Sequence, residues 1–136
     1  APTASVFSLG TAGDVNTSGS TYIAYLFATL AGISKVGSYT GNGTTQTIDC
    51  GFSTSARWIV IKRTDSAGSW CVWDTEKGGN GGIVAGDEAF LALNTNGGNS
   101  SYQDTIDPDS SGFTVHETTN SSVNVSGASY VFYATA

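Results

Sequence analysis

The chain has 136 residues, a length that suits one domain with its own hydrophobic core. Its net charge is −6 with 5 Lys and Arg residues, which argues against binding to nucleic acid or to an anionic membrane surface, because both need a basic face. Only 12% of the residues are charged, 18 are Gly and none is Met, and no apolar run reaches the roughly 18 residues of a membrane-spanning helix.

The beginning of the chain is expected to supply two strands. A composition this rich in Gly favours short strands joined by polar turns over helices. Residues 6–9 are the first strand candidate, and residues 10–20 are a turn-rich loop. Residues 21–31 (TYIAYLFATLA) fit a helix or a strand. We interpret them as a buried strand, because aromatic residues are frequent and Ser and Gly flank the run.

Part of this beginning recurs at the end of the chain. Residues 15–25 (VNTSGSTYIAY) match residues 123–133 (VNVSGASYVFY). The repeat predicts that residues 1–31 are a terminal strand pair resembling the end of a preceding repeat, and that residues 32–136 are a complete β-sandwich module. An orphan strand pair has open edges, so we expect it to pair with its own module, an upstream domain or a neighbouring chain.

The middle of the chain predicts a β-hairpin. Residues 56–63 (ARWIVIKR) and 70–74 (WCVWD) are β-branched and aromatic runs of strand length, joined by a polar turn that contains Gly68. Large apolar side chains occupy both faces of both strands. The hairpin should therefore lie centrally, with the other strands packed around it.

Further strand candidates complete an all-β fold. They lie at residues 46–50, 89–94 and 113–117 and in the closing apolar run. Together the strands predict a two-layer antiparallel β-sandwich of jelly-roll or lectin-like type. The core is expected to draw on Tyr25, Phe27, Phe52, Ile59, Ile61, Val72, Trp73, Phe90, Leu91, Phe113, Val131 and Tyr133.

The two cysteines have two interpretations. Cys50 and Cys71 can form a disulfide only if their strands lie side by side, because the Cα atoms must come within about 7 Å. Alternatively, they are two small buried hydrophobic residues. The sequence leaves both open.

The acidic residues Asp104, Asp107 and Asp109 are the weak candidates for a calcium site, since carboxylate oxygens are the ligands that calcium prefers. Their spacing does not match a helix-loop-helix calcium loop, and Pro108 favours an ordinary acidic turn. The single histidine, His116, should face away from the core because it alternates with Phe113 and Val115.

The candidate ligand-binding residues are Trp70, Asp74, Lys62 and Tyr102. Trp70 follows the hairpin turn and is the tryptophan expected to be exposed. An exposed indole beside polar groups suits a sugar, whose ring stacks on the aromatic face. The alternatives are core packing for any Trp, and a surface ion pair of Lys62 with a nearby carboxylate.

The sequence contains no arrangement that predicts catalysis. There is no G-x-S-x-G motif, and the position of His116 suggests no nucleophile beside it. Nothing singles out two of the 11 acidic residues as a glycosidase pair, although such an enzyme remains an alternative. We therefore expect a non-enzymatic protein without a cofactor.

Five motifs in fixed order resemble a family of tailed-phage virion modules, which often lie near the C-terminus of long tail or fibre polypeptides. They are KVGSYTGNGTTQTIDCGF, ARWIVIKRTDSAGSWCVWDT, GGIVAGDEAFLALN, YQDTIDPDSSGF and VNVSGASYVFYATA. The resemblance implies a structural module on the surface of a virion, such as a tail fibre, that serves assembly and attachment to host-surface glycans. It also implies a homo-oligomer, for example a trimer, with other virion proteins as partners. The alternative is a decoration or filament subunit linked to its neighbours by β-strand exchange.

Overall fold

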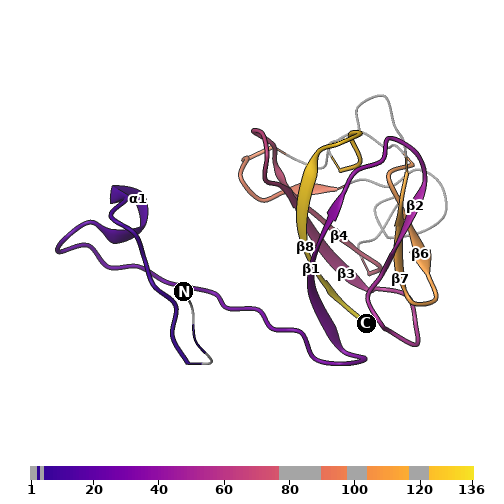
Figure 1. The fold of residues 1–136 in the computed structure, drawn as a ribbon, viewed down its shortest axis with the longest axis horizontal. Helices are drawn as coiled ribbons and strands as arrows, with labels where there is room; N and C mark the ends of the chain where they lie inside the picture. Colours follow the sequence, from indigo (N-terminus) through magenta and orange to yellow (C-terminus); the bar gives the residue numbers. More distant parts are fainter. Residues whose placement is uncertain (1–2, 4, 77–89, 98–103, 117–122) are drawn as a thin grey trace.

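The computed structural model describes residues 3, 5–76, 90–97, 104–116 and 123–136. Within them, an all-β sandwich of two antiparallel sheets follows a long N-terminal segment, as Figure 1 shows. The helix of this described part is α1 (Gly13–Asn16), a single turn. No helix there is long and apolar enough to cross a membrane.

The larger sheet, sheet A, contains the predicted hairpin. Its strands are β1 (Ser34–Thr40), β8 (Ser129–Thr135), β3 (Trp58–Arg63), β4 (Trp70–Asp74) and β5 (Leu91–Ala92), in the order β1-β8-β3-β4-β5. The hairpin is β3 and β4, with Trp58 opposite Asp74 and Lys62 opposite Trp70. Strand β3 lies in the middle of the sheet, which confirms the central position that its apolar residues predict.

The smaller sheet, sheet B, corrects the prediction of an acidic turn. Its strands are β2 (Gln46–Asp49), β7 (Gly112–Val115) and β6 (Ile106–Asp109), in the order β2-β7-β6. Pro108 lies inside β6, opposite Phe113. An edge strand tolerates Pro, because one side of its backbone has no neighbouring strand to receive an N–H.

The core lies between the two sheets. Ile59, Ile61 and Trp73 from sheet A are at most 1% exposed, and so is Phe113 from sheet B. The rings of Phe113 and Phe132 meet edge to face at 5.3 Å. Burial of each such side chain stabilises the fold by about 1.5–3 kcal/mol. Cys50 and Cys71 are buried in this core and form no disulfide with each other, as the hydrophobic interpretation has it.

Six of the predicted core residues are buried: Phe52, Ile59, Ile61, Val72, Trp73 and Phe113. Five of them lie between the two sheets, whereas Val72 is buried on the other side of sheet A, opposite Val60. Phe90 packs partly buried against Trp73. The prediction is wrong for Val131, because β8 directs Phe132 toward the core. Val131 is therefore 39% exposed, with the half-buried Tyr133, on the side of sheet A that faces away from the core. Tyr25, Phe27 and Leu91 are exposed as well.

The N-terminal segment, which we call the arm (the described residues up to 33), contradicts the predicted strand pair. Residues 6–9 and 21–31 form no strand; the single pairing is a bridge between Leu30 and Ser34. The arm leaves the sandwich beside β1 and extends away from both sheets (Figure 1). A strand needs a neighbour to receive its backbone hydrogen bonds, and no strand of the described chain lies beside most of the arm.

A carboxylate joins the hairpin turn to β8. Asp65 accepts hydrogen bonds from Arg63 Nε at 3.0 Å, from Arg63 Nη2 at 2.9 Å and from the backbone N–H of Ser129 at 3.0 Å. The bonds from Arg63 and the amide of Ser129 hold the pKa of Asp65 well below its usual value. The turn is therefore anchored to the start of the strand that β3 pairs with.

Asp65→Asn should lower the melting temperature near neutral pH, and the loss should shrink in acid. Because folding depresses the pKa of Asp65, its carboxylate stabilises the fold fully above the unfolded pKa of about 3.9 and less as the pH falls through the folded value. Melting temperatures of both proteins from about pH 3 to 7 check this, with Asp14→Asn as a control of equal charge. A loss that does not change with pH would contradict the assignment.

Candidate functional site

The arm carries a folded copy of the turn that precedes β8. In the arm, the backbone N–H of Thr17 donates to Tyr22 Oη at 2.9 Å. At the end of the chain, the backbone N–H of Val125 donates to Tyr130 Oη at 3.1 Å. These four residues occupy equivalent positions of the sequence repeat, so an equivalent tyrosine hydroxyl accepts the equivalent hydrogen bond in each turn.

The backbone of the two turns agrees as well. Gly19 has a φ of 80° and its counterpart Gly127 a φ of 78°, a region that glycine adopts without strain. The N–H of Ser20 donates to the carbonyl of Thr17 at 3.2 Å, and the N–H of Ala128 to its equivalent at 3.0 Å. The sequence repeat is thus a structural repeat, which forms from local contacts in the absence of a sheet.

The two copies differ in what surrounds them. Tyr130 is 1% exposed and belongs to β8, which lies between β1 and β3. After the turn in the arm, Ile23, Tyr25 and Leu26 are 82%, 80% and 76% exposed. The arm is also nearly free of charge, since Asp14 is its one ionisable acidic or basic side chain. The arm therefore presents an apolar, strand-like segment to solvent.

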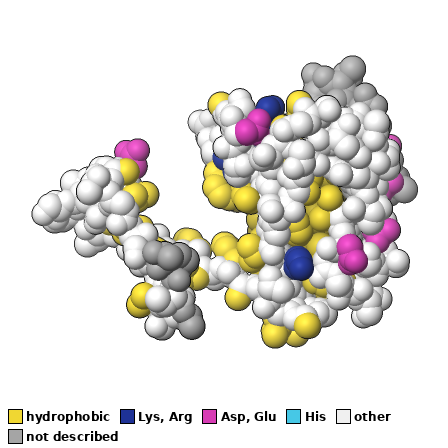
Figure 2. All heavy atoms as spheres, viewed as in Figure 1, with side chains coloured by type: hydrophobic (Ala, Val, Ile, Leu, Met, Phe, Trp, Pro, Cys, Tyr) yellow, Lys and Arg dark blue, Asp and Glu magenta, His cyan; other side chains and the backbone are white. Residues whose placement is uncertain are grey.

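A second apolar surface lies on the side of sheet A that faces away from the core. We call it the outer face, and it includes Val36, Trp58, Val60, Trp70, Val131 and Tyr133. Figure 2 shows hydrophobic side chains along the arm and on the side of the sandwich toward it. A cavity of about 160 Å³ opens here, lined by Phe27, Val36, Val60, Trp70, Val131, Phe132 and Tyr133.

One residue of the arm already contacts this face. The ring of Phe27 lies 4.6 Å from the ring of Tyr133, which also meets Trp58 at 5.8 Å. Sequence reasoning missed this contact because it assigned Phe27 and Tyr133 to the core. Side chains of β8 alternate between the two faces of sheet A. With Phe132 facing the core, this alternation could have predicted that Tyr133 faces away from it.

The structure places three of the four predicted ligand-binding residues on the outer face. Trp70 is 46% exposed, as predicted, and Lys62 lies opposite it across the hairpin. Asp74 projects from the same face of β4, four residues after Trp70. The fourth, Tyr102, lies outside the described residues. Lys62 Nζ donates to a backbone carbonyl rather than to a carboxylate, and the expected surface ion pair is formed by Arg63 and Asp65 instead.

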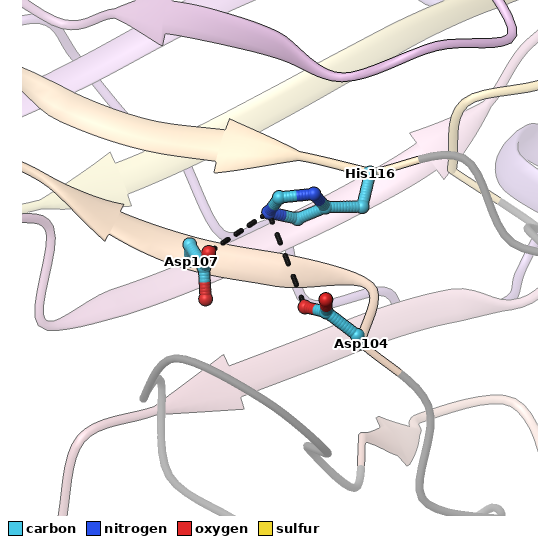
Figure 3. Close-up of side chains that lie close together, drawn as sticks. All are labelled: Asp104, Asp107 and His116. Atoms are coloured by element: carbon cyan, nitrogen blue, oxygen red, sulfur yellow. Dashed lines mark hydrogen bonds and ion pairs between the residues drawn. The ribbon is translucent and has the colours of Figure 1, made fainter.

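A separate cluster joins Asp104, Asp107 and His116 on sheet B (Figure 3). His116 Nε2 lies 3.0 Å from Asp107 Oδ2 and 4.0 Å from Asp104 Oδ1. The other ring nitrogen, Nδ1, lies 3.2 Å from the hydroxyl of Thr45. Antiparallel pairing of β6 with β7 brings the histidine beside these carboxylates. The strand register that follows from the turn between β6 and β7 could have predicted this contact.

This cluster differs from the candidate calcium trio in one member. Asp109 does not join it, because its Oδ1 accepts hydrogen bonds from the N–H and the hydroxyl of Ser111, both at 2.9 Å. An imidazole with two carboxylates is a ligand set for transition metals rather than for calcium. The contacts present make it a hydrogen-bonded clasp that joins the start of β2 to the β6–β7 hairpin.

His116→Ala should reduce the free energy of unfolding by about 1 kcal/mol, because hydrogen bonds to Asp107 and Thr45 are lost together. Urea unfolding measures this, and Thr47→Ala, which removes one hydroxyl contact on the same sheet, is the control. An unchanged midpoint and slope for His116→Ala would mean that the cluster does not act as a clasp.

The family comparison covers the arm and the sandwich together. A family model described as "Domain of unknown function (DUF7483)" matches residues 1–136. No curated protein matches the chain, and no solved structure matches it.

Proposed function

The chain belongs to the DUF7483 family, and from that premise we propose that it is a non-enzymatic structural module that assembles through its arm. The family match extends over the arm, which supports treating the arm as a working part of the domain. The motif order that resembles phage virion modules supports a place in a tail fibre or related virion protein, on the surface of an extracellular particle. Its partners are then further copies of itself and other virion proteins.

The observation that carries this proposal is the exposed apolar segment of the arm. Ile23, Tyr25 and Leu26 are each more than three-quarters exposed, and they lie close together in a part of the arm outside any helix or strand. Soluble proteins rarely expose a contiguous apolar surface unless it binds something. Extended segments of this kind bind by joining a neighbour's sheet or by laying alternate side chains into its pockets.

Attachment to a host glycan stays a prediction beside this one. Trp70 and Lys62 lie close enough on the outer face to serve a sugar ring and its hydroxyls. Their neighbours Val60 and Val131 are apolar, however, and offer no hydrogen bonds. The surface therefore suits an apolar protein segment better than a polar sugar.

The non-enzymatic part of the proposal rests on the one histidine. Both ring nitrogens of His116 already have partners, Thr45 on one side and Asp107 on the other. These contacts hold two segments of sheet B together, which supports a structural role for the imidazole.

Replacing Tyr25 and Leu26 together by Asp should convert the protein from an oligomer to a monomer. Two charges on the arm would oppose its burial, while the sandwich should unfold as before, because these side chains are 80% and 76% exposed. Sedimentation velocity over a range of concentrations measures the change. The control is Ser18→Asp, an exposed polar position of the arm. A parent protein that is monomeric at every concentration would contradict the proposal.

A further inference from the structure

We propose that the arm of one copy lies across the outer face of sheet A in a second copy of this chain. This inference rests on the proposed assembly function and names the surface that receives the arm. Ile23, Tyr25 and Leu26 of the first copy would cover Val36 and Val131 of the second.

The two surfaces match in chemistry. On the outer face, Val36, Trp70 and Val131 are 43%, 46% and 39% exposed, although each projects from a strand within the sheet. The arm brings exposed aromatic and aliphatic side chains and almost no charge. Contact between the two removes apolar area from water on both sides.

The face already binds a side chain of the arm. Phe27 packs on Tyr133 and forms one wall of the cavity of about 160 Å³. Apolar cavities of about 150 Å³ take up a group the size of benzene. The cavity beside Phe27 can therefore receive one further aromatic ring, and Tyr25, two residues along, is 80% exposed.

The path of the chain indicates that the arm that covers the outer face comes from a second copy and not from the same copy. The hydroxyl of Ser34 donates to the carbonyl of Ala28 at 2.9 Å, and the N–H of Val36 donates to Thr29 Oγ1 at 3.0 Å. These bonds, with the Leu30–Ser34 bridge, fix the direction in which the arm leaves β1, and it runs away from the sandwich (Figure 1). Covering its own face would require the arm to reverse this path.

Each copy has one arm and one outer face. Two copies can therefore exchange arms reciprocally in a twofold dimer, or each arm can bind the next copy in a ring or filament.

A complementation experiment with the full chain tests the inference. One variant carries Tyr25→Asp and Leu26→Asp in the arm and keeps its outer face. The other carries Val131→Lys on the outer face and keeps its arm. We expect each variant alone to be monomeric. An equimolar mixture should form a species of two copies, because one intact arm meets one intact face, and sedimentation velocity measures its mass.

Two further variants keep the result interpretable. Val36→Lys places the same charge on β1 and should act like Val131→Lys, which guards against a folding defect confined to β8. Thr47→Lys places it on the exposed surface of sheet B and should assemble like the parent.

The outcomes distinguish binding of the arm to the outer face from assembly through the arm in general. Face variants that assemble like the parent, while the arm variant does not, would overturn the outer face as the receiving surface and leave assembly through the arm intact. A mixture that stays monomeric would also overturn the inference. A monomeric parent would overturn both.

Discussion

The alternation of side chains along β8 determines both the core and the surface of sheet A. This strand lies between β1 and β3, so every second residue is buried against sheet B and the others face outward. Phe132 fills the core, and it needs Gly37 opposite, because a Cβ there would lie 2.5 Å from its ring. The same phase directs Val131 and Tyr133 outward, which makes the outer face apolar.

The sequence of the turn and of β8 occurs a second time in the arm. The arm reproduces the turn before β8, including its tyrosine hydrogen bond and its left-handed glycine, but no sheet receives the residues that follow. In the sandwich, burial of the equivalent residues stabilises the fold. In the arm, Tyr25 and Leu26 retain that apolar surface, and contact with another copy is the way to bury it.

Local patterns predicted the sandwich better than they predicted its surface. The hairpin of β3 and β4 was predictable because its two runs and its turn are adjacent in the chain. Pro108 led to the wrong prediction of a turn, because Pro is excluded from central strands but tolerated in an edge strand. Whether a strand lies at the edge depends on the order of the whole sheet. The prediction of two strands in the arm was wrong because a strand-like composition does not provide the neighbouring strand that a strand needs. Trp70 was predicted as exposed from the turn beside it, whereas the contact of His116 with Asp107 depends on register.

The proposed assembly places the arm of one copy on the outer face of another. The most direct measurement is a disulfide between Tyr25→Cys in one chain and Val131→Cys in a second chain of different isotopic mass, because a disulfide requires Cα atoms within about 7 Å. Cys50 and Cys71 are buried and leave the introduced thiols as the accessible pair. Mass spectrometry should find a cross-linked product that contains both masses. Absence of this product under oxidising conditions in which the parent protein is oligomeric would contradict the account.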